Sequence, residues 1–420
     1  MKKIRILLFF RHLLKTDPIV WVFLAFLISY LLFFVRPVFF SEAMNFPKYV
    51  PALKPIGADL KNTLNVSSEF LVNKQTPYYE GDDFAYPPLT ILFVSPLLFF
   101  DNLTLAYKIV TVVNVICYVL ITLVFPFRLG KKIIPLTMLI FITGLFSYGF
   151  QFELERGQFN LIAISICFLA IWIFHYRDRF RYLAYILFTI SVQLKVFPFI
   201  FIFMFIKDWR NWKNTFKRFL LLLTMNILAL FVLGPKLFID FIEAIRNHTN
   251  NPYIWPGNHS IHSFITQVFE VASRHDWTWA NQYARTAEIV LFAIVIGCIF
   301  IIMFQSYRQR QKTMNPVLLL ALTIGALIIP SASHDYTLSF LSAPVSIYLS
   351  SNMFSARAEN LRLRFLLILF LIIFSFSYFY TLFSYIYKSY NYIFVNNFPA
   401  LFMMLLIVTL FSLVSKPTLK

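Results

Sequence analysis

The chain has 420 residues, of which 59% are hydrophobic, only 13% carry a charge and 52 are phenylalanine. This composition excludes a soluble globular protein and is typical of an integral membrane protein. The formal net charge of +18 does not indicate a nucleic-acid partner, because the basic residues form clusters beside apolar runs, as the positive-inside rule expects of cytoplasmic loops. We therefore expect membrane lipids, and no nucleic acid, around these clusters, which are Lys2–Lys15, Arg128–Lys132, Arg177–Arg181, Lys207–Arg218, Arg308–Lys312, Arg357–Arg364 and Lys416–Lys420.

Apolar runs follow one another along the chain after an N-terminal segment that we interpret as a cytoplasmic amphipathic lead. This segment does not read as a signal peptide, because Arg11 and Lys15 interrupt its short apolar run. A membrane helix requires about 20 mostly apolar residues, and none of the runs shows the alternation of a barrel strand. The runs are 19–40, 104–126, 133–150, 159–176, 182–206, 219–235, 286–306, 316–330, 337–350, 363–384 and 392–414.

These runs predict an all-α polytopic membrane protein, one membrane domain over residues 1–420 with about 11 to 13 transmembrane helices. With every basic cluster on the cytoplasmic side, residues 41–87 and 235–285 become two larger outer loops. Turns near 151–158, 331–336 and 385–391 also lie outside. For the chain to alternate between the two sides of the membrane in this way, 88–103 must not cross fully and 182–206 must break near Lys195 and Pro198. We therefore expect short or re-entrant helices there, which membranes tolerate where they line a cavity.

Neither a disulfide framework nor a metal-binding spacing is visible in the sequence. Cys117, Cys167 and Cys298 all lie inside apolar runs, as small core residues do. Glu80, Asp82 and Asp83 could hold a divalent cation, but that spacing is weak without further ligands. We predict no metal and no cofactor.

Polar residues concentrate in a few segments at the expected outer edge of the membrane. The first outer loop is rich in acids, and each of the later segments joins polar side chains to proline, glycine or histidine. In chain order the segments are Gly57–Leu60, Tyr86–Leu89, Glu155–Asn160, Gln193–Pro198, Pro256–Ser263 and Pro330–Tyr336.

The ordered set of motifs in these segments resembles the polytopic GT-C glycosyltransferases, in particular the bacterial polyprenyl-phosphate-mannose-dependent alpha-mannosyltransferases of the cell envelope. The resemblance covers about residues 55 to 345. One departure concerns the last motif, in which that family has a Trp before an Asp-His pair and this chain has His334 before Asp335. The motifs are Asp59, Tyr86-Pro87-Pro88-Leu89, Gly157-Gln158-Phe159-Asn160, Lys195-Val196-Phe197-Pro198, Asn258-His259-Ser260 and Ser333-His334-Asp335-Tyr336.

This resemblance implies a GT-C-like bundle and an inverting hexosyltransferase in the plasma (inner) membrane, with a cytoplasmic N-terminus. It would move a sugar, mannose by resemblance, from a polyprenyl-phosphate donor to a lipid-linked or glycan acceptor on the outer face. It also implies that Asp59 is the catalytic base. A carboxylate suits that task because it can take the proton of the acceptor hydroxyl. The alternative is that Asp59 caps the N-terminus of a helix that starts at Leu60.

The departing phosphate needs cationic or donor groups at the membrane edge. Lys195, within an apolar run, is the best candidate for that contact and Arg156 the second, although both could simply reach toward lipid headgroups. His259, His262 and His334 could donate to phosphate or sugar hydroxyls, or be ordinary polar loop residues. Together with Tyr86, Asn258 and Asp335, these side chains are the predicted donor-binding set.

Gln158 and Asn160 belong to the same predicted set, as sugar-binding residues. They open an apolar run, and interhelical hydrogen bonds are the equally plausible role. In the Tyr86-Pro87-Pro88 segment the prolines should end the outer loop sharply. An interfacial aromatic belt is predicted from Trp255, Trp277, Trp279, Tyr78, Tyr79 and Tyr86.

Two other functions fit a polytopic chain. An O-antigen-type glycan polymerase or lipid-linked glycan flippase also has large outer loops, but such polymerases depend on outer-loop arginines, which are few here. A secondary transporter should show inverted repeats and charges within its spans, and apart from Lys195 neither is visible.

Overall fold

The computed structural model describes the parts of the chain that carry the candidate site. The N-terminal lead, most of the first apolar run, the acids Glu80, Asp82 and Asp83, and the turn at 385–391 lie outside the described residues. The described residues are 20, 23–24, 27, 56–78, 84–100, 102–130, 135–145, 147–255, 257–274, 277–309, 313–350, 361–376 and 396–414.

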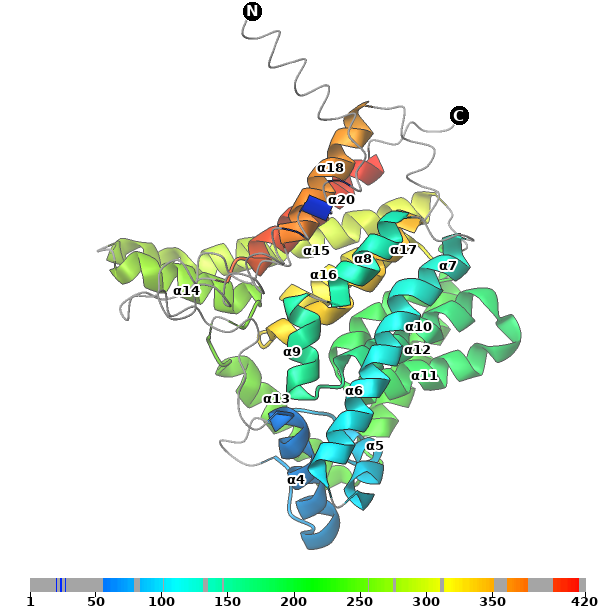
Figure 1. Ribbon diagram of the computed structural model, residues 1–420, viewed down its shortest axis with the longest axis vertical. Helices are drawn as coiled ribbons and strands as arrows, with labels where there is room; N and C mark the ends of the chain where they lie inside the picture. Colours follow the sequence, from blue (N-terminus) through cyan, green and yellow to red (C-terminus); the bar gives the residue numbers. More distant parts are fainter. Residues whose placement is uncertain are drawn as a thin grey trace, which may run out of the picture.

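All regular structure within these residues is helical, which confirms the predicted class, and one isolated bridge joins Asn258 to His334. Figure 1 shows α4 and α13 at one end of the molecule and α18 and α20 toward the other. The α-helices are α4 (Ala58–Asn73), α5 (Thr90–Val94), α6 (Leu103–Val119), α7 (Phe125–Gly130), α8 (Pro135–Leu145), α9 (Tyr148–Arg156), α10 (Asn160–Tyr176), α11 (Arg181–Leu194), α12 (Trp212–Leu230), α13 (Pro235–Asn250), α14 (Ile261–Arg274), α15 (Ala284–Arg308), α16 (Pro316–Ile328), α17 (Ser342–Ser350), α18 (Leu361–Phe376) and α20 (Phe398–Val414). Short 3-10 or π segments are η2 (Ser95–Phe99), η3 (Leu120–Val124), η4 (Asp178–Phe180), η5 (Phe197–Met204), η6 (Thr278–Tyr283) and η7 (Asp335–Phe340).

Two helices in the described part are long and apolar enough to cross a membrane, Leu103–Arg128 and Trp279–Arg308. The number rises to four if each of two bent helix pairs, α8 with α9 (44°) and α12 with α13 (105°), counts as one span. Shorter apolar helices accompany them, such as α10 and α16. The total of about 11 to 13 crossings stays a prediction.

Both expected interruptions are present. Residues 90–99 form two short helices, α5 and η2, instead of one span. The run 182–206 divides into α11, which ends at Leu194, and the 3-10 helix η5, with Lys195 extended between them. Pro198 accounts for the break, because proline in a helix would clash with the carbonyl four residues earlier and cannot donate its hydrogen bond.

The two segments predicted as outer loops contain helices in their described parts. The first contains α4, and the second contains α13 and α14. All three helices are amphipathic, with buried residues confined to one side of α4 and α13. The start of α4 was considered from sequence only as the alternative role of Asp59, and α13 and α14 were missed. Polar residues interrupt each of these helices, so that only the 3.6-residue period indicates them.

The main hydrophobic core surrounds α10 and α16. Every residue from Val317 to Ile328 is buried, as expected of a helix that is apolar all round. Beside this core, α9 packs against η7, and α10 packs along α11. The core therefore fixes the ends of α9, α11 and α16, where the polar motifs stand.

Candidate functional site

Most of the predicted site residues meet at one cavity of about 820 Å³. Its walls come from segments far apart in the sequence, including α4, the ends of α9 and α11, and the start of η7. Sequence reasoning named Asp59, Tyr86, Arg156, Gln158, Asn160, Lys195, His262 and His334 among the lining residues.

Two glycines bring Asp59 to the end of α9. Gly157 ends that helix with a φ of 67°, and Gly57 precedes α4 with a φ of 76°, both in the left-handed region that favours glycine. The Gly57 N–H donates to the Glu155 carbonyl at 2.8 Å. A Cβ at position 157 would lie 2.9 Å from the Leu60 Cβ, so the two segments approach more closely than side chains would allow.

Asp59 faces the cavity and the end of α9. Its Oδ2 accepts from Gln158 Nε2 at 2.5 Å, and its Oδ1 accepts from Arg156 Nη1 at 3.3 Å. The alternative N-cap role is wrong, because Gly57 occupies the N-cap of α4 and Asp59 stands in the first helical turn. The carboxylate is about 29% exposed, so it is held in place yet open to the cavity.

Gln158 links the acid to a buried cation. Its Oε1 accepts from Lys195 Nζ at 2.7 Å and from the Tyr86 hydroxyl at 3.1 Å, while its Nε2 donates to Asp59. Its own backbone carbonyl is held by Asn114 Nδ2 at 2.8 Å. These partners fix which way the amide points, since oxygen can only accept and the NH₂ group can only donate.

Lys195 lies in the cavity wall, largely buried. It is 8% exposed, and its Nζ stands 4.0 Å from the centre of the Tyr86 ring, a cation–π distance. Arg156 is held in a similar way, with its guanidinium 5.2 Å from the Phe152 ring and its Nε 3.5 Å from Glu155. Two cations and one carboxylate therefore share the same wall.

Glu153 is a buried acid that sequence reasoning treated only as an outer-turn residue. Its Oε2 accepts from Asn160 Nδ2 at 2.7 Å and its Oε1 from the Leu161 N–H at 3.1 Å. It therefore caps the start of α10, where the helix dipole favours a carboxylate, and fixes Asn160. Asn160 lines the cavity and also makes this bond within the helix bundle, so both roles considered for it from sequence are compatible.

His334 presents one hydrogen-bond donor to the cavity. Trp255 Nε1 donates to His334 Nδ1 at 3.0 Å, so the ring proton of neutral His334 is on Nε2. Burial lowers the pKa of His334 to about 3, and nearby His259, Lys195 and Arg156 act in the same direction. His334 is therefore neutral at pH 7.

Trp255, predicted as part of an interfacial belt, lines the cavity. Trp277 and Trp279 are exposed, as that belt requires. Trp255 comes from the loop before Asn258 and contacts His334 of the Ser333–Tyr336 segment. Its neighbour Tyr336, which also lines the cavity, has its pKa raised by burial.

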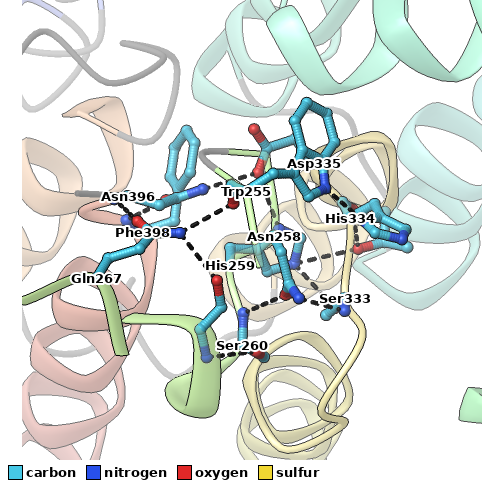
Figure 2. Close-up of polar contacts among 12 residues, drawn as sticks. Trp255, Asn258, His259, Ser260, Gln267, Ser333, His334, Asp335, Asn396 and Phe398 are labelled. Atoms are coloured by element: carbon cyan, nitrogen blue, oxygen red, sulfur yellow. Dashed lines mark hydrogen bonds and ion pairs between the residues drawn. The ribbon is translucent and has the colours of Figure 1, made fainter. Parts of the chain in front are cut away.

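Three predicted residues, Asn258, His259 and Asp335, are fully buried and do not line the cavity. His259 Nδ1 is 3.0 Å from Asp335 Oδ1, and its Nε2 is 3.1 Å from Ser333 Oγ. Figure 2 shows these residues as one network. Ser333 belongs to the cavity wall, so the network supports the wall from behind.

The same network ties in the C-terminal helix α20. Asn396 Nδ2 donates to Asp335 at 3.1 Å, and its N–H donates to Gln267 Oε1 at 2.8 Å. Asn258 joins the loop before α14 to the loop before η7, because its Oδ1 accepts from the N–H groups of Ser260 and Ser333.

His262 lines a different part of the same cavity and pairs with Glu288, Nδ1 to Oε1, at 2.8 Å. Glu288 was not identified from sequence, because a single acid near the start of an apolar run carries no motif. Within the described residues, no three His, Cys, Asp or Glu side chains are grouped to hold a metal ion.

A comparison with protein families gives one match. The sequence model of glycosyltransferase family 87 matches residues 84–331 of the chain. The matched range contains Tyr86, Arg156–Asn160, Lys195 and Asn258–His262, while Asp59 precedes it and His334 and Asp335 follow it. No curated protein matches the chain, and no solved structure matches it.

Proposed function

We propose that this membrane glycosyltransferase moves mannose from a polyprenyl-phosphate donor to a glycan or glycolipid acceptor. The premise is that the chain belongs to glycosyltransferase family 87, as its motifs indicated. The observation that carries this proposal is the wall formed by Asp59, Arg156, Gln158 and Lys195, where a carboxylate and two cations face one cavity.

The reaction is a direct displacement at the anomeric carbon. An acceptor hydroxyl oxygen forms the new bond to C1 as the bond between C1 and the phosphate oxygen breaks. The hydroxyl proton passes to Asp59, and the bonding electrons leave with the polyprenyl phosphate. The sugar configuration inverts, because attack and departure occur on opposite faces.

The two cations stabilise the leaving phosphate. As the C1–O bond breaks, negative charge grows on the phosphate oxygens, and fixed cations at that point lower the barrier. Lys195 is suited to this role because it is buried and held by Gln158 and Tyr86, so it needs little reorganisation. Arg156 is suited to bind phosphate oxygens, since its planar fork offers several donors.

Other residues orient the substrate. Asn160 can donate to or accept from sugar hydroxyls, and the Nε2–H of His334 can donate to them. Asn258, His259 and Asp335 act as positioning residues, through Ser333 and Thr337 of the wall. We further propose that the whole chain is one domain of the inner membrane, with its N-terminus in the cytoplasm and its cavity open to the outer face.

The test is a transfer assay with the purified protein in liposomes. Polyprenyl-phosphate-mannose and polyprenyl-phosphate-glucose are offered in turn with a panel of lipid-linked acceptors. The proposal predicts that mannose is transferred and that NMR of the product shows an inverted anomeric centre. Consumption of the glucose donor alone, or a product with retained configuration, would contradict it.

A further inference from the structure

A second polar pair lines the cavity from helices that contribute nothing to the Asp59 wall. His262 stands at the start of α14 and Glu288 near the start of α15, with His262 Nδ1 2.8 Å from Glu288 Oε1. Their side chains are 33% and 24% exposed. They are thus half-buried, open to the cavity and fixed by each other.

The hydrogen-bonding capacity of this pair is specific. An ionised carboxylate can only accept, so the shared proton lies on His262 Nδ1. This leaves Glu288 Oε2, which accepts, and His262 Nε2, which accepts in the neutral ring and donates in the protonated one. Neither atom has another hydrogen bond within the described part of the chain. Two neighbouring polar atoms of this kind suit hydroxyl groups, which can both donate and accept.

The charge of Glu288 separates this pair from the wall at Arg156 and Lys195. The wall sets two cations against the one carboxylate of Asp59, so it attracts a phosphate, whereas Glu288, paired with His262, repels one, because charges in a partly desolvated cavity interact strongly. A neutral sugar carries no such penalty at Glu288. Sequence reasoning grouped His262 with the donor-phosphate residues, and its carboxylate partner argues for a different ligand.

Aromatic and apolar residues elsewhere in the lining of the same cavity fit a sugar as well. Tyr253 and Trp255 contribute aromatic rings 6.3 Å apart to the same cavity, and Phe292 follows Glu288 by one turn of α15. A few fixed polar groups among aromatic and apolar side chains are usual in pockets that bind small organic ligands.

We propose that His262 and Glu288 form the acceptor subsite, binding hydroxyl groups of a neutral sugar on the acceptor while the donor phosphate lies at Arg156 and Lys195. This inference rests on the proposed function. It assigns different lining residues of one cavity to the two substrates.

Two binding probes test the assignment in the full chain, reconstituted in nanodiscs. Saturation-transfer NMR measures binding of methyl α-D-mannopyranoside, and the shift in melting temperature measures binding of decaprenyl phosphate. Glu288→Gln and His262→Gln should each weaken glycoside binding by about tenfold or more, since a hydrogen bond to a charged group is lost or disturbed, and leave the decaprenyl phosphate shift unchanged. Lys195→Gln should do the reverse.

Glu243→Gln is the matched control, because Glu243 is an exposed acid of α13 that does not line the cavity, and it should change neither signal. Three results overturn the inference. The wild type does not bind the glycoside, or both Glu288→Gln and His262→Gln still bind it, or Lys195→Gln loses glycoside binding to the same extent as they do. A wild type that binds the glycoside but not decaprenyl phosphate contradicts the proposed donor instead, so the two failures are distinguishable.

Discussion

Substitution of Gly157 by alanine should cost activity because of a contact and not only because of backbone strain. The left-handed φ of 67° costs an L-residue about 1–2 kcal/mol. The new Cβ would lie 2.9 Å from the Leu60 Cβ, whereas carbon atoms pack at about 3.5–4.0 Å. The end of α9 must therefore move from α4 by roughly 0.6–1.1 Å, and misplacement on that scale costs up to about 10²-fold in rate.

The assay compares Gly157→Ala with Gly234→Ala, in both melting temperature and kcat/KM for transfer. Gly234 also has a positive φ, 107°, but nothing within 4 Å of its Cβ position, and it does not line the cavity. Both variants should lose stability, and only Gly157→Ala should lose about 10- to 10²-fold in kcat/KM. Full activity in Gly157→Ala would refute the reasoning that this contact holds Arg156 and Gln158 against Asp59.

Three further predictions concern single side chains. Lys195→Gln should lower kcat/KM about 10²- to 10³-fold, as loss of a preorganised charge-stabilising donor does. The melting temperature should not fall. Unchanged transfer would exclude Lys195 from the phosphate site. Glu153→Gln puts its NH₂ group against one of two donors, Asn160 Nδ2 or the Leu161 N–H. Both the melting temperature and transfer should therefore fall, by about 1–3 kcal/mol in stability, and a neutral outcome would contradict its capping role. The pKa of His334 is lower in the folded protein than its ordinary value of 6.5, which the unfolded chain keeps. As the pH falls, the unfolded chain therefore takes up this proton before the folded protein does. His334 therefore contributes stability fully above about pH 6.5 and progressively less toward pH 3, so the melting temperature should drop more between pH 7 and 5 in the wild type than in His334→Gln. Equal drops would contradict a neutral His334.

Much of the site was predictable because its residues stand in local motifs. Asp59, Gln158 and Lys195 each belong to a short polar segment in apolar sequence, and the structure brings all three together. The break after Leu194 was also predictable, since Pro198 cannot continue the helix. Such signals are carried by neighbouring residues and need no knowledge of the tertiary fold.

The missed residues depend on contacts between distant segments. Glu153 resembles any outer-turn acid until the start of α10 folds back onto it. Trp255 resembles a belt residue until η7 brings His334 to its indole. Asn396 lies beyond the matched family range, and only the packing of α20 brings it to Asp335. Conversely, Asn258 and His259 stand in a motif, yet their side chains are enclosed behind the wall.

The most direct test of the account is transfer of mannose by Asp59→Asn, compared with Glu69→Gln, an exposed acid on the same helix α4. The asparagine keeps the shape of Asp59 and can still accept from Gln158, but it cannot take a proton. The account predicts a loss of about 10²-fold or more in kcat for Asp59→Asn, with an unchanged melting temperature and with wild-type activity in Glu69→Gln. Transfer that survives in Asp59→Asn, or that fails in Glu69→Gln instead, would contradict Asp59 as the base.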